Sequence, residues 1–199
     1  ALLSVAARKA ADAALTGMEF ASGIPGSVGE AVVMNAGAYG GEMKQIVKKA
    51  TVLTAEGMEK ELSAEELDFG YRHSSIAGMQ AIVLEAVFAL EKGDPAAIEE
   101  QMSKLCSQRS EKQPLEYPSA GSTFKRPEGY FAGKLIQDAG LRGYRVGDAQ
   151  VSEKHCGFVI NRGEATAAQI RQLIHDVQDK VAEQFGVRLE TEVRFVGEF

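Results

Sequence analysis

The segment that most restricts how this chain can fold is its glycine-rich stretch, residues 23–43, which reads GIPGSVGEAVVMNAGAYGGEM. Glycine adopts positive φ angles and lets a backbone come close to another group, so this composition interrupts regular helices and strands. The N–H groups of such a stretch carry little side-chain bulk around them, and a run of them can form a concave anion-binding site. The stretch matches neither GxGxxG nor the P-loop pattern. By itself it favours a set of tight turns, with anion binding as the alternative.

The amino-terminal half outside this stretch alternates patterns typical of helices and strands. Its apolar spacing predicts a helix over residues 2–14. A β-hairpin is predicted to begin with the strand Val47–Thr54 and to turn at Glu56–Gly57, and a further strand is predicted over residues 81–90.

The carboxy-terminal half continues this alternation, so the whole chain predicts an α+β fold with a seam near residues 92–98. Asp94–Pro95 has the residue types of a helix N-cap and first helical position. The polar segment 107–130 predicts a long loop, and loops of this length are usually functional. Thr166 and Gln169 have capping-box spacing at the head of a long helix. The other predicted elements are a short helix over 133–141, strands near 144–151 and 156–161, and a last strand over 188–196.

Charge and composition argue against several classes of function. The chain has 199 residues and a net charge of −6, whereas nucleic acids and anionic membrane surfaces attract cationic proteins. No apolar run is long enough to cross a bilayer, and residues 1–20 do not resemble a signal peptide. Cys106 and Cys156 are far apart and are expected to be buried thiols in a reducing compartment. The three histidines lack metal-ligand spacing, so no metal is expected.

A serine in an uncommon setting is the first candidate for chemistry. Residues 119–127 read SAGSTFKRP, which places Ser122 after a glycine and ahead of Lys125 and Arg126. A hydroxyl can donate or accept a hydrogen bond, and the two cations favour its deprotonated form or bind a phosphate. No Ser-His-Asp arrangement is visible that would make it an acyl nucleophile. On position alone, a serine that caps a turn is the commoner role.

Two short motifs supply charged candidates. Arg72, in FGYRHSS, offers a planar fork for a carboxylate, although an arginine beside Tyr71 can equally be a surface stacking pair. Glu190 and Glu192, in LETEVRF, would point to one face of a strand, which is also typical of a solvated strand face. The residue types alone therefore leave a functional and a surface role open for each.

Taken together, these motifs resemble those of one enzyme family. GIPGSVGEA followed by NAGAYGG is similar to the flavin-binding segment of the MurB family, the UDP-N-acetylenolpyruvoylglucosamine reductases of peptidoglycan synthesis. FGYRHSS, SAGSTFKRP, AGLRGYRVGDAQVSEKHCGFVIN and LETEVRFVG resemble the family's other signatures, in the family's order, over residues 1–199. Glu30 stands where the family commonly has glycine. If this backbone faces the flavin pyrophosphate, the Glu30 side chain should point away from it.

The resemblance implies a reaction and its cofactors. The family reduces the enolpyruvyl ether of UDP-N-acetylglucosamine to UDP-N-acetylmuramate, with NADPH as reductant and FAD as hydride carrier. The chain resembles the shorter family type, which has no tyrosine-bearing insertion, and it looks like a fragment without the amino-terminal flavin-binding part. The flavin carries the difficult chemistry, so the protein has to supply positioning and electrostatic stabilisation.

The resemblance also implies a role for each candidate residue. Arg72 would stabilise the substrate carboxylate, Ser122 would donate the proton, and Glu192 would assist protonation, with Glu190 less favoured for that role. The residues implied to contact the flavin are Gly23, Ile24, Gly26, Ser27, Gly29 and Asn35, and those implied to bind the substrate are Tyr71, Lys125 and Arg126.

In the family's organisation, residues 1–97 would form part of an FAD-binding α+β domain, which the last strand, 189–199, rejoins. Residues 98–188 would form a smaller α+β domain that binds the UDP-sugar. We expect a cytoplasmic monomer without nucleic-acid or membrane partners. The alternatives are an inactive fragment or a flavin-free UDP-sugar-binding module. A related flavin oxidase is disfavoured, because an oxidase needs no proton donor for a carbanion.

Overall fold

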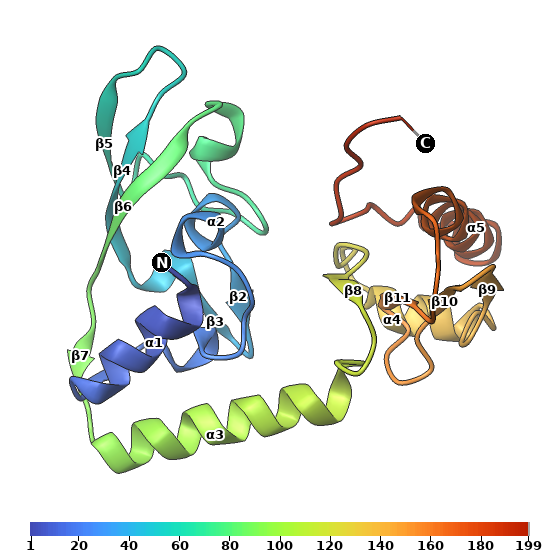
Figure 1. The fold of residues 1–199 in the computed structure, drawn as a ribbon, viewed down its shortest axis with the longest axis horizontal. Coiled ribbons are helices and arrows are strands. Elements are labelled where there is room, and N and C mark those ends of the chain that lie inside the picture. The colour runs from blue at the N-terminus through green and yellow to red at the C-terminus, as the bar shows by residue number, and fades with distance from the viewer. Residues whose placement is uncertain (199) are drawn as a thin grey trace. The chain divides into compact units, whose positions relative to one another are not determined.

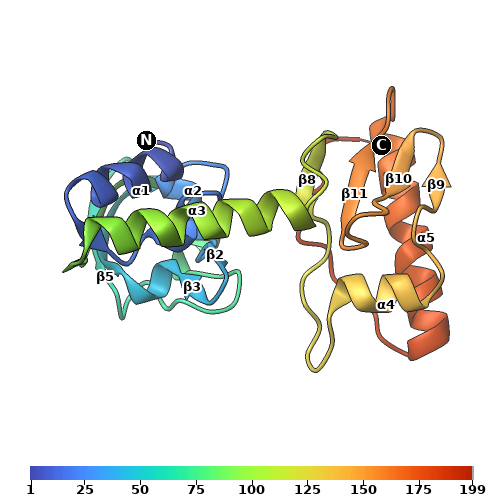
Figure 2. The ribbon, with the colours of Figure 1, turned by 90° about the horizontal axis from the view of Figure 1, so that it is seen from below.

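The computed structural model describes residues 1–198, which form two compact units, Ala1–Arg109 and the chain from Ser110 onward. The unit boundary therefore lies after residue 109 and not at 97/98 as expected. The first part of helix α3 (Pro95–Lys112) belongs to the first unit because Ile98, Met102 and Leu105 are buried there. Helix α3 runs alongside α1 (Leu3–Asp12), to which Arg8 and Glu99 link it by an ion pair of 2.5 Å (Figure 2).

The first unit has a three-stranded antiparallel sheet in the order β5-β4-β6. Its buried side chains include Ala50, Val52 and Leu62, and α2 packs beside β6. The predicted hairpin and the strand after it are confirmed. The elements of this unit besides α1 and α3 are β1 (Leu15–Thr16), η1 (Glu19–Ala21), α2 (Val28–Val33), β2 (Gly37–Ala38), β3 (Gly41–Glu42), η2 (Met43–Gln45), β4 (Val47–Leu53), β5 (Glu59–Ser63), η3 (Ser75–Gly78), β6 (Ile82–Phe88) and β7 (Glu91–Lys92).

The glycine-rich stretch folds as short elements joined by tight turns, as its composition predicts. Glycine is required where chain segments touch, because a Cβ at Gly41 would lie 2.5 Å from the ring of Phe20. A Cβ at Gly37 would lie 2.7 Å from the carbonyl oxygen of Gly41, within the β2–β3 pair. Both distances are shorter than real Cβ contacts. Close packing therefore explains why glycine occupies positions 37 and 41, whether or not a ligand binds.

The second unit is a four-stranded antiparallel sheet in the order β8-β11-β10-β9, against which helix α5 packs. Leu173, Ile174 and Val177 of α5 share a core with Ile136 and Val151. The elements of this unit are β8 (Ser119–Ser122), α4 (Ala132–Asp138), β9 (Arg145–Val146), β10 (Ala149–Val151), β11 (Phe158–Asn161) and α5 (Ala167–Phe185).

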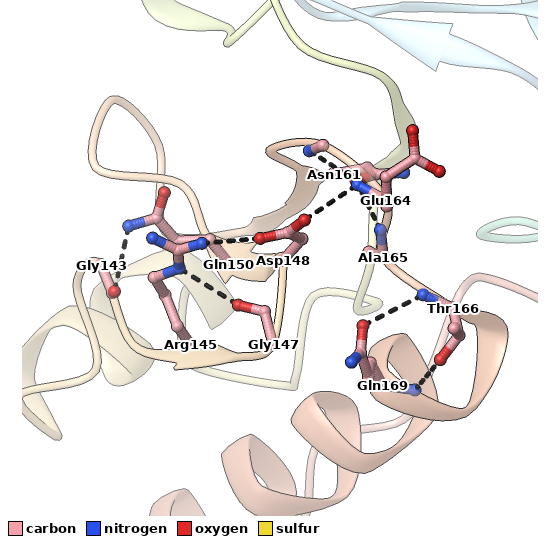
Figure 3. Close-up of polar contacts among 11 residues, drawn as sticks. Gly143, Arg145, Gly147, Asp148, Gln150, Asn161, Glu164, Ala165, Thr166 and Gln169 are labelled. Carbon is pink, nitrogen blue, oxygen red and sulfur yellow. Dashed lines mark hydrogen bonds and ion pairs between the residues drawn. The ribbon is translucent and has the colours of Figure 1, made fainter.

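A cluster of polar contacts fixes the chain that enters α5 (Figure 3). Asp148, in the β9–β10 turn, pairs with Arg145 at 3.0 Å and accepts the Glu164 N–H at 2.9 Å. The predicted capping box is confirmed: the Thr166 hydroxyl accepts the Gln169 N–H at 3.2 Å, and the Gln169 side chain accepts the Thr166 N–H at 3.1 Å. The start of the longest helix is thus held both locally and by a distant turn.

Two further sequence-based expectations are wrong. Residues 107–112 continue helix α3, and β8 lies inside the segment predicted to be one long loop. Cys106 is exposed, whereas Cys156 is buried as expected. Burial raises the pKa of the Cys156 thiol.

The last strand does not form within residues 188–196, where one isolated bridge joins Thr191 to Phe124. Leu189 lies in the core of the second unit, so this segment packs with that unit. Position 199 of the predicted strand lies outside the described residues. No helix among residues 1–198 is long and apolar enough to cross a membrane.

Candidate functional site

The candidate residues of the first unit include a tight turn that presents Tyr71 and Arg72. Gly70 and His73 exchange backbone hydrogen bonds of 3.1 and 3.3 Å, which leaves the two residues between them at the tip. Arg72 has a φ of 52°, and its guanidinium carbon lies 5.4 Å from the centre of the Tyr71 ring. The stacking pair that the sequence left open is therefore present. Because 57% of Tyr71 is exposed, the pair also offers an aromatic face and a cation on the surface of its unit.

Asn35 connects this turn to the glycine-rich stretch. Its side chain is 2% exposed, and its Nδ2 donates to the carboxylate of Glu42 and to the carbonyl of Gly70, both at 2.9 Å. Its Oδ1 accepts the N–H of Lys44 at 2.8 Å. Every donor of this amide is used inside the protein. Asn35 therefore holds the Tyr71–Arg72 turn in place, which the resemblance alone did not indicate for it.

The other residues implied to contact the flavin lie around α2. Ser27 is the N-cap of this helix, and its hydroxyl accepts the N–H of Glu30 at 3.2 Å. Gly29 lies against Val83, and Ile24 packs on the core of the unit. Among the described residues, the N–H groups of Gly23 and Gly26 donate to no protein acceptor. The backbone at these two glycines, and not the Ser27 hydroxyl, is what the stretch can offer to a ligand.

The Glu30 side chain has a role within the helix cap of α2. Its carboxylate turns back and accepts the N–H of Ser27 at 2.6 Å, which completes the capping box of α2. This hydrogen bond to the backbone, followed by the one with the Ser27 side chain, lowers the pKa of Glu30. An acidic side chain is stable at this place because helix N-termini attract negative charge.

A second group of candidate residues lies on β8, within the other unit. Ser122 ends this strand, is exposed, and pairs with Phe158 of β11. Gly121 before it has a φ of +81°, in the region that favours glycine, and no atom lies within 4 Å of its Cβ position. The next residue, Thr123, is 3% exposed, and its hydroxyl accepts the N–H of Val159 at 3.0 Å. Thr123 thereby anchors the chain that carries Ser122.

Glu192 pairs through its backbone with Thr123, the residue after Ser122. The N–H of Glu192 donates to the carbonyl of Thr123 at 2.9 Å, and the N–H of Lys125 donates to the carbonyl of Glu190 at 2.9 Å. The structure thus places the predicted serine and acidic residue on two neighbouring segments of one unit. The segment that carries Glu192 does not form a regular strand.

The two predicted substrate-binding cations have partners of their own. The Lys125 ammonium lies 3.1 Å from the Glu190 carboxylate, and both side chains are largely exposed. The guanidinium carbon of Arg126 lies 4.0 Å from the centre of the Phe131 ring. Exposed ion pairs of this kind contribute little stability, so Lys125 can exchange Glu190 for another anion at small cost.

Two residues that sequence reasoning missed, Thr123 and Ser74, anchor the candidate residues within their own units. The Ser74 hydroxyl is buried and donates to the carbonyl of Val33 at 2.6 Å, which fixes the chain that leaves the Tyr71–Arg72 turn. The only signal for them in the sequence was a small hydroxyl residue next to a candidate site residue, and whether such a residue is buried depends on tertiary contacts.

Among residues 1–198, no group of three or more His, Cys, Asp or Glu residues is placed to hold a metal.

A pocket of about 430 Å³ lies next to Ser122 in the second unit. β8 contributes Ser119 and Ala120 to it, and α5 contributes Ile170 and Ile174. Arg194 brings a positive charge to a wall that is otherwise mostly apolar.

Comparisons with known proteins agree with this arrangement of two units. Residues 2–63 match the domain family described as FAD binding domain. Residues 113–196 match the family described as UDP-N-acetylenolpyruvoylglucosamine reductase, C-terminal domain. The fold and the two matches define a protein in which an FAD-binding type of unit precedes a reductase-specific domain.

Individual relatives identify the family. The UDP-N-acetylenolpyruvoylglucosamine reductase of Agathobacter rectalis is 64% identical over all 199 residues, and that of Limosilactobacillus fermentum is 59% identical over 188 residues, or 94% of the chain. The crystal structure of UDP-N-acetylenolpyruvylglucosamine reductase (MurB) from Thermus caldophilus has a TM-score of 0.86 and 37% identity, and the match covers 97% of this chain and 69% of that one. The chain belongs to the MurB family of UDP-N-acetylenolpyruvoylglucosamine reductases. It spans 63% of the length of each of these two curated relatives.

Proposed function

We propose that the chain is the larger part of a flavin-dependent reductase that converts UDP-N-acetylglucosamine enolpyruvate to UDP-N-acetylmuramate for peptidoglycan synthesis. The observation that carries this proposal is the exposed Ser122, whose neighbour Thr123 pairs with Glu192, inside the segment that matches the family's C-terminal domain. We place the protein in the cytoplasm as a monomer, with NADPH and the UDP-sugar as its small-molecule partners. The domain roles follow the family: FAD at the first unit and the UDP-sugar at the second.

The first unit fits an FAD cofactor. The uncommitted N–H groups of Gly23 and Gly26 are donors suited to the cofactor's oxygen atoms, and they lie in the segment that matches an FAD-binding family. When bound, FAD supplies the hydride that originates from NADPH. Asn35 contributes indirectly, because its hydrogen bonds hold the Tyr71–Arg72 turn in place.

In this mechanism the side chains of the chain manage charge and a proton. Negative charge develops on the substrate carbon next to the carboxylate and spreads into that carboxylate. The Arg72 guanidinium binds the carboxylate and stabilises this charge. The Ser122 hydroxyl donates its proton to the carbon, and the Glu192 carboxylate orients or reprotonates the serine. Lys125 and Arg126 bind the diphosphate of the UDP-sugar, and Tyr71 packs against the substrate.

The test uses the protein as its gene encodes it. We expect a yellow protein that oxidises NADPH only when the enolpyruvyl sugar is present. Ser122→Ala should reduce turnover by roughly 10²- to 10⁴-fold while NADPH still reduces the flavin at the wild-type rate, because the loss affects only proton donation. The control is Ser119→Ala on the same strand, which should retain turnover.

Two results would contradict the proposal. If the Ser122→Ala and Ser119→Ala proteins turn over equally, Ser122 is not the proton donor. If the protein binds the UDP-sugar but neither takes up flavin nor oxidises NADPH, the flavin-free binding module is correct instead.

A further inference from the structure

Arg109 is a cation that the roles proposed above leave unused. It lies in α3, at the carboxy-terminal limit of the first unit, and is about half buried. Its side chain covers Gly23: a Cβ on that glycine would lie 3.2 Å from the Arg109 Cδ. Tyr39 and Cys106 are close enough to influence its charge. Arg109 therefore contacts the glycine-rich stretch at the first of its glycines.

No anion in the described part of the chain neutralises this cation. Other arginines have partners, for example Arg8 with Glu99 and Arg145 with Asp148. The Arg109 side chain makes neither a hydrogen bond nor an ion pair within residues 1–198. A partly buried charge without a partner costs free energy, so it is unusual in a chain with a net charge of −6. Burial lowers the pKa of Arg109 below that of an ordinary arginine, but guanidinium groups stay charged in proteins.

The neighbouring backbone supplies a second group for an anion. The N–H of Gly23 donates to no protein acceptor among the described residues, and it belongs to the residue that Arg109 covers. The other end of the loop is less suitable, because a Cβ on Gly26 would lie 3.0 Å from the Glu30 carboxylate. A second negative charge would be repelled there. The charges of the loop therefore favour an anion at Gly23 and Arg109.

We propose that Arg109, together with the Gly23 N–H, binds an anionic group of the flavin cofactor. This inference rests on the proposed function, because it assigns the ligand to the flavin. Two parts of FAD carry the required negative charge: the pyrophosphate, and the isoalloxazine ring in its reduced anionic form. A charge-assisted hydrogen bond from a guanidinium suits either of them.

The contact with Arg109 also explains why position 23 is glycine. Its missing side chain leaves room for the Arg109 stem. Gly23→Ala should therefore displace Arg109 and reproduce the effect of Arg109→Met. The chosen variants of Arg109 are Met, which keeps the length of the stem without charge, and Lys, which keeps the charge without the fork. The matched control is Lys104→Met, which removes an exposed cation from the same helix.

The first measurement compares the affinity of the gene's full protein for FAD and for riboflavin, together with the midpoint potential of the bound FAD. If Arg109 binds the pyrophosphate, Arg109→Met weakens FAD binding roughly 10- to 100-fold and leaves riboflavin binding unchanged. If it binds the reduced ring, the variant lowers the midpoint potential and changes the affinity for oxidised FAD little. In both cases Arg109→Lys is intermediate and Lys104→Met behaves as wild type. Unchanged affinity and potential in Arg109→Met would overturn the proposal.

A second measurement separates this proposal from the proposed function. Inorganic pyrophosphate is titrated into the flavin-free protein while the NMR signals of the Gly23 amide and the Arg109 Nε–H are followed. If both signals shift in the wild type and the Gly23 shift is lost in Arg109→Met, Arg109 and Gly23 form an anion site. If such a protein takes up no flavin, only the assignment of the anion to flavin and the proposed reductase fail. The role of Arg109 is refuted if pyrophosphate causes no shift and Arg109→Met binds flavin normally. The proposed reductase function is unaffected by that result.

Discussion

At the residue scale, Asn35 shows how a buried amide can determine the position of a distant turn. Replacing it with alanine removes three hydrogen bonds, to Glu42, Lys44 and Gly70. Because the partners stay buried or part-buried without replacements, we expect Asn35→Ala to lower the free energy of unfolding by about 2–4 kcal/mol, measured by urea denaturation. Amide exchange of His73 should accelerate at the same time, since its turn loses its anchor.

The φ of 46° at Asn35 offers a competing explanation that a second variant separates. Asn35→Gly relieves any strain of this positive φ but lacks the hydrogen bonds. We expect it to be clearly less stable than wild type. A glycine variant as stable as wild type would mean that the backbone conformation, and not the hydrogen bonds, explains asparagine at this position.

Glu30 gives a prediction for pH. Its pKa is lower in the folded protein than the ordinary value of 4.5, because the carboxylate accepts the Ser27 N–H. A lowered pKa means that the stabilisation is fully present above pH 4.5 and is lost as the pH falls through the folded-state value. Wild type should therefore melt about 1–2 °C above Glu30→Gln at pH 7, and the two melting temperatures should converge below pH 4. A difference that is the same at pH 7 and pH 3 would show that the charge of Glu30 is not involved.

At the scale of elements, the amino-terminal cap of α5 is the clearest local determinant. Thr166→Ala removes the hydroxyl that accepts the Gln169 N–H, and we expect it to lower the free energy of unfolding by about 1 kcal/mol. Thr166→Ser keeps the hydroxyl and should remain within a few tenths of a kcal/mol of wild type. Chemical denaturation of the three proteins measures both differences. Equal stability of the alanine and serine variants would mean that other contacts hold the helix start without the cap. These are Asp148, which accepts the Glu164 N–H, and Asn161, whose side chain accepts the Ala165 N–H at 3.0 Å.

Elements with strong local signals were predicted correctly from the sequence. The capping residues of α5 and the turn between β4 and β5 act over a few residues, so their effect is visible in a short window. The end of α3 was not predicted, because polar residues 107–112 carry no local preference that separates an exposed helical turn from a loop. The prediction of a last strand was wrong for a related reason. LETEVRF alternates as a strand does, but it pairs only with the short segment around Phe124.

At the scale of the whole molecule, each unit has its own hydrophobic core. Leu62 belongs to the core of the first unit and Leu173 to that of the second, and both are almost fully buried. Replacing either by alanine should cost about 2–5 kcal/mol of stability in the unit that contains it. We expect Leu62→Ala to accelerate amide exchange in β4 but not in β10, and Leu173→Ala to do the reverse. Acceleration of both strands by either variant would mean that the two cores unfold as one cooperative unit.

The sequence by itself determined the family, the α+β alternation and the residue types of the candidate site. These properties depend on order along the chain: motifs keep their spacing, and caps and turns act between near neighbours. Only the tertiary structure decided that Glu30 caps α2, that Asn35 is buried under the Tyr71–Arg72 turn, and that Arg109 covers Gly23 without a counter-charge. Burial and pairing of a polar group depend on which distant segment lies against it, and no local pattern encodes that neighbour.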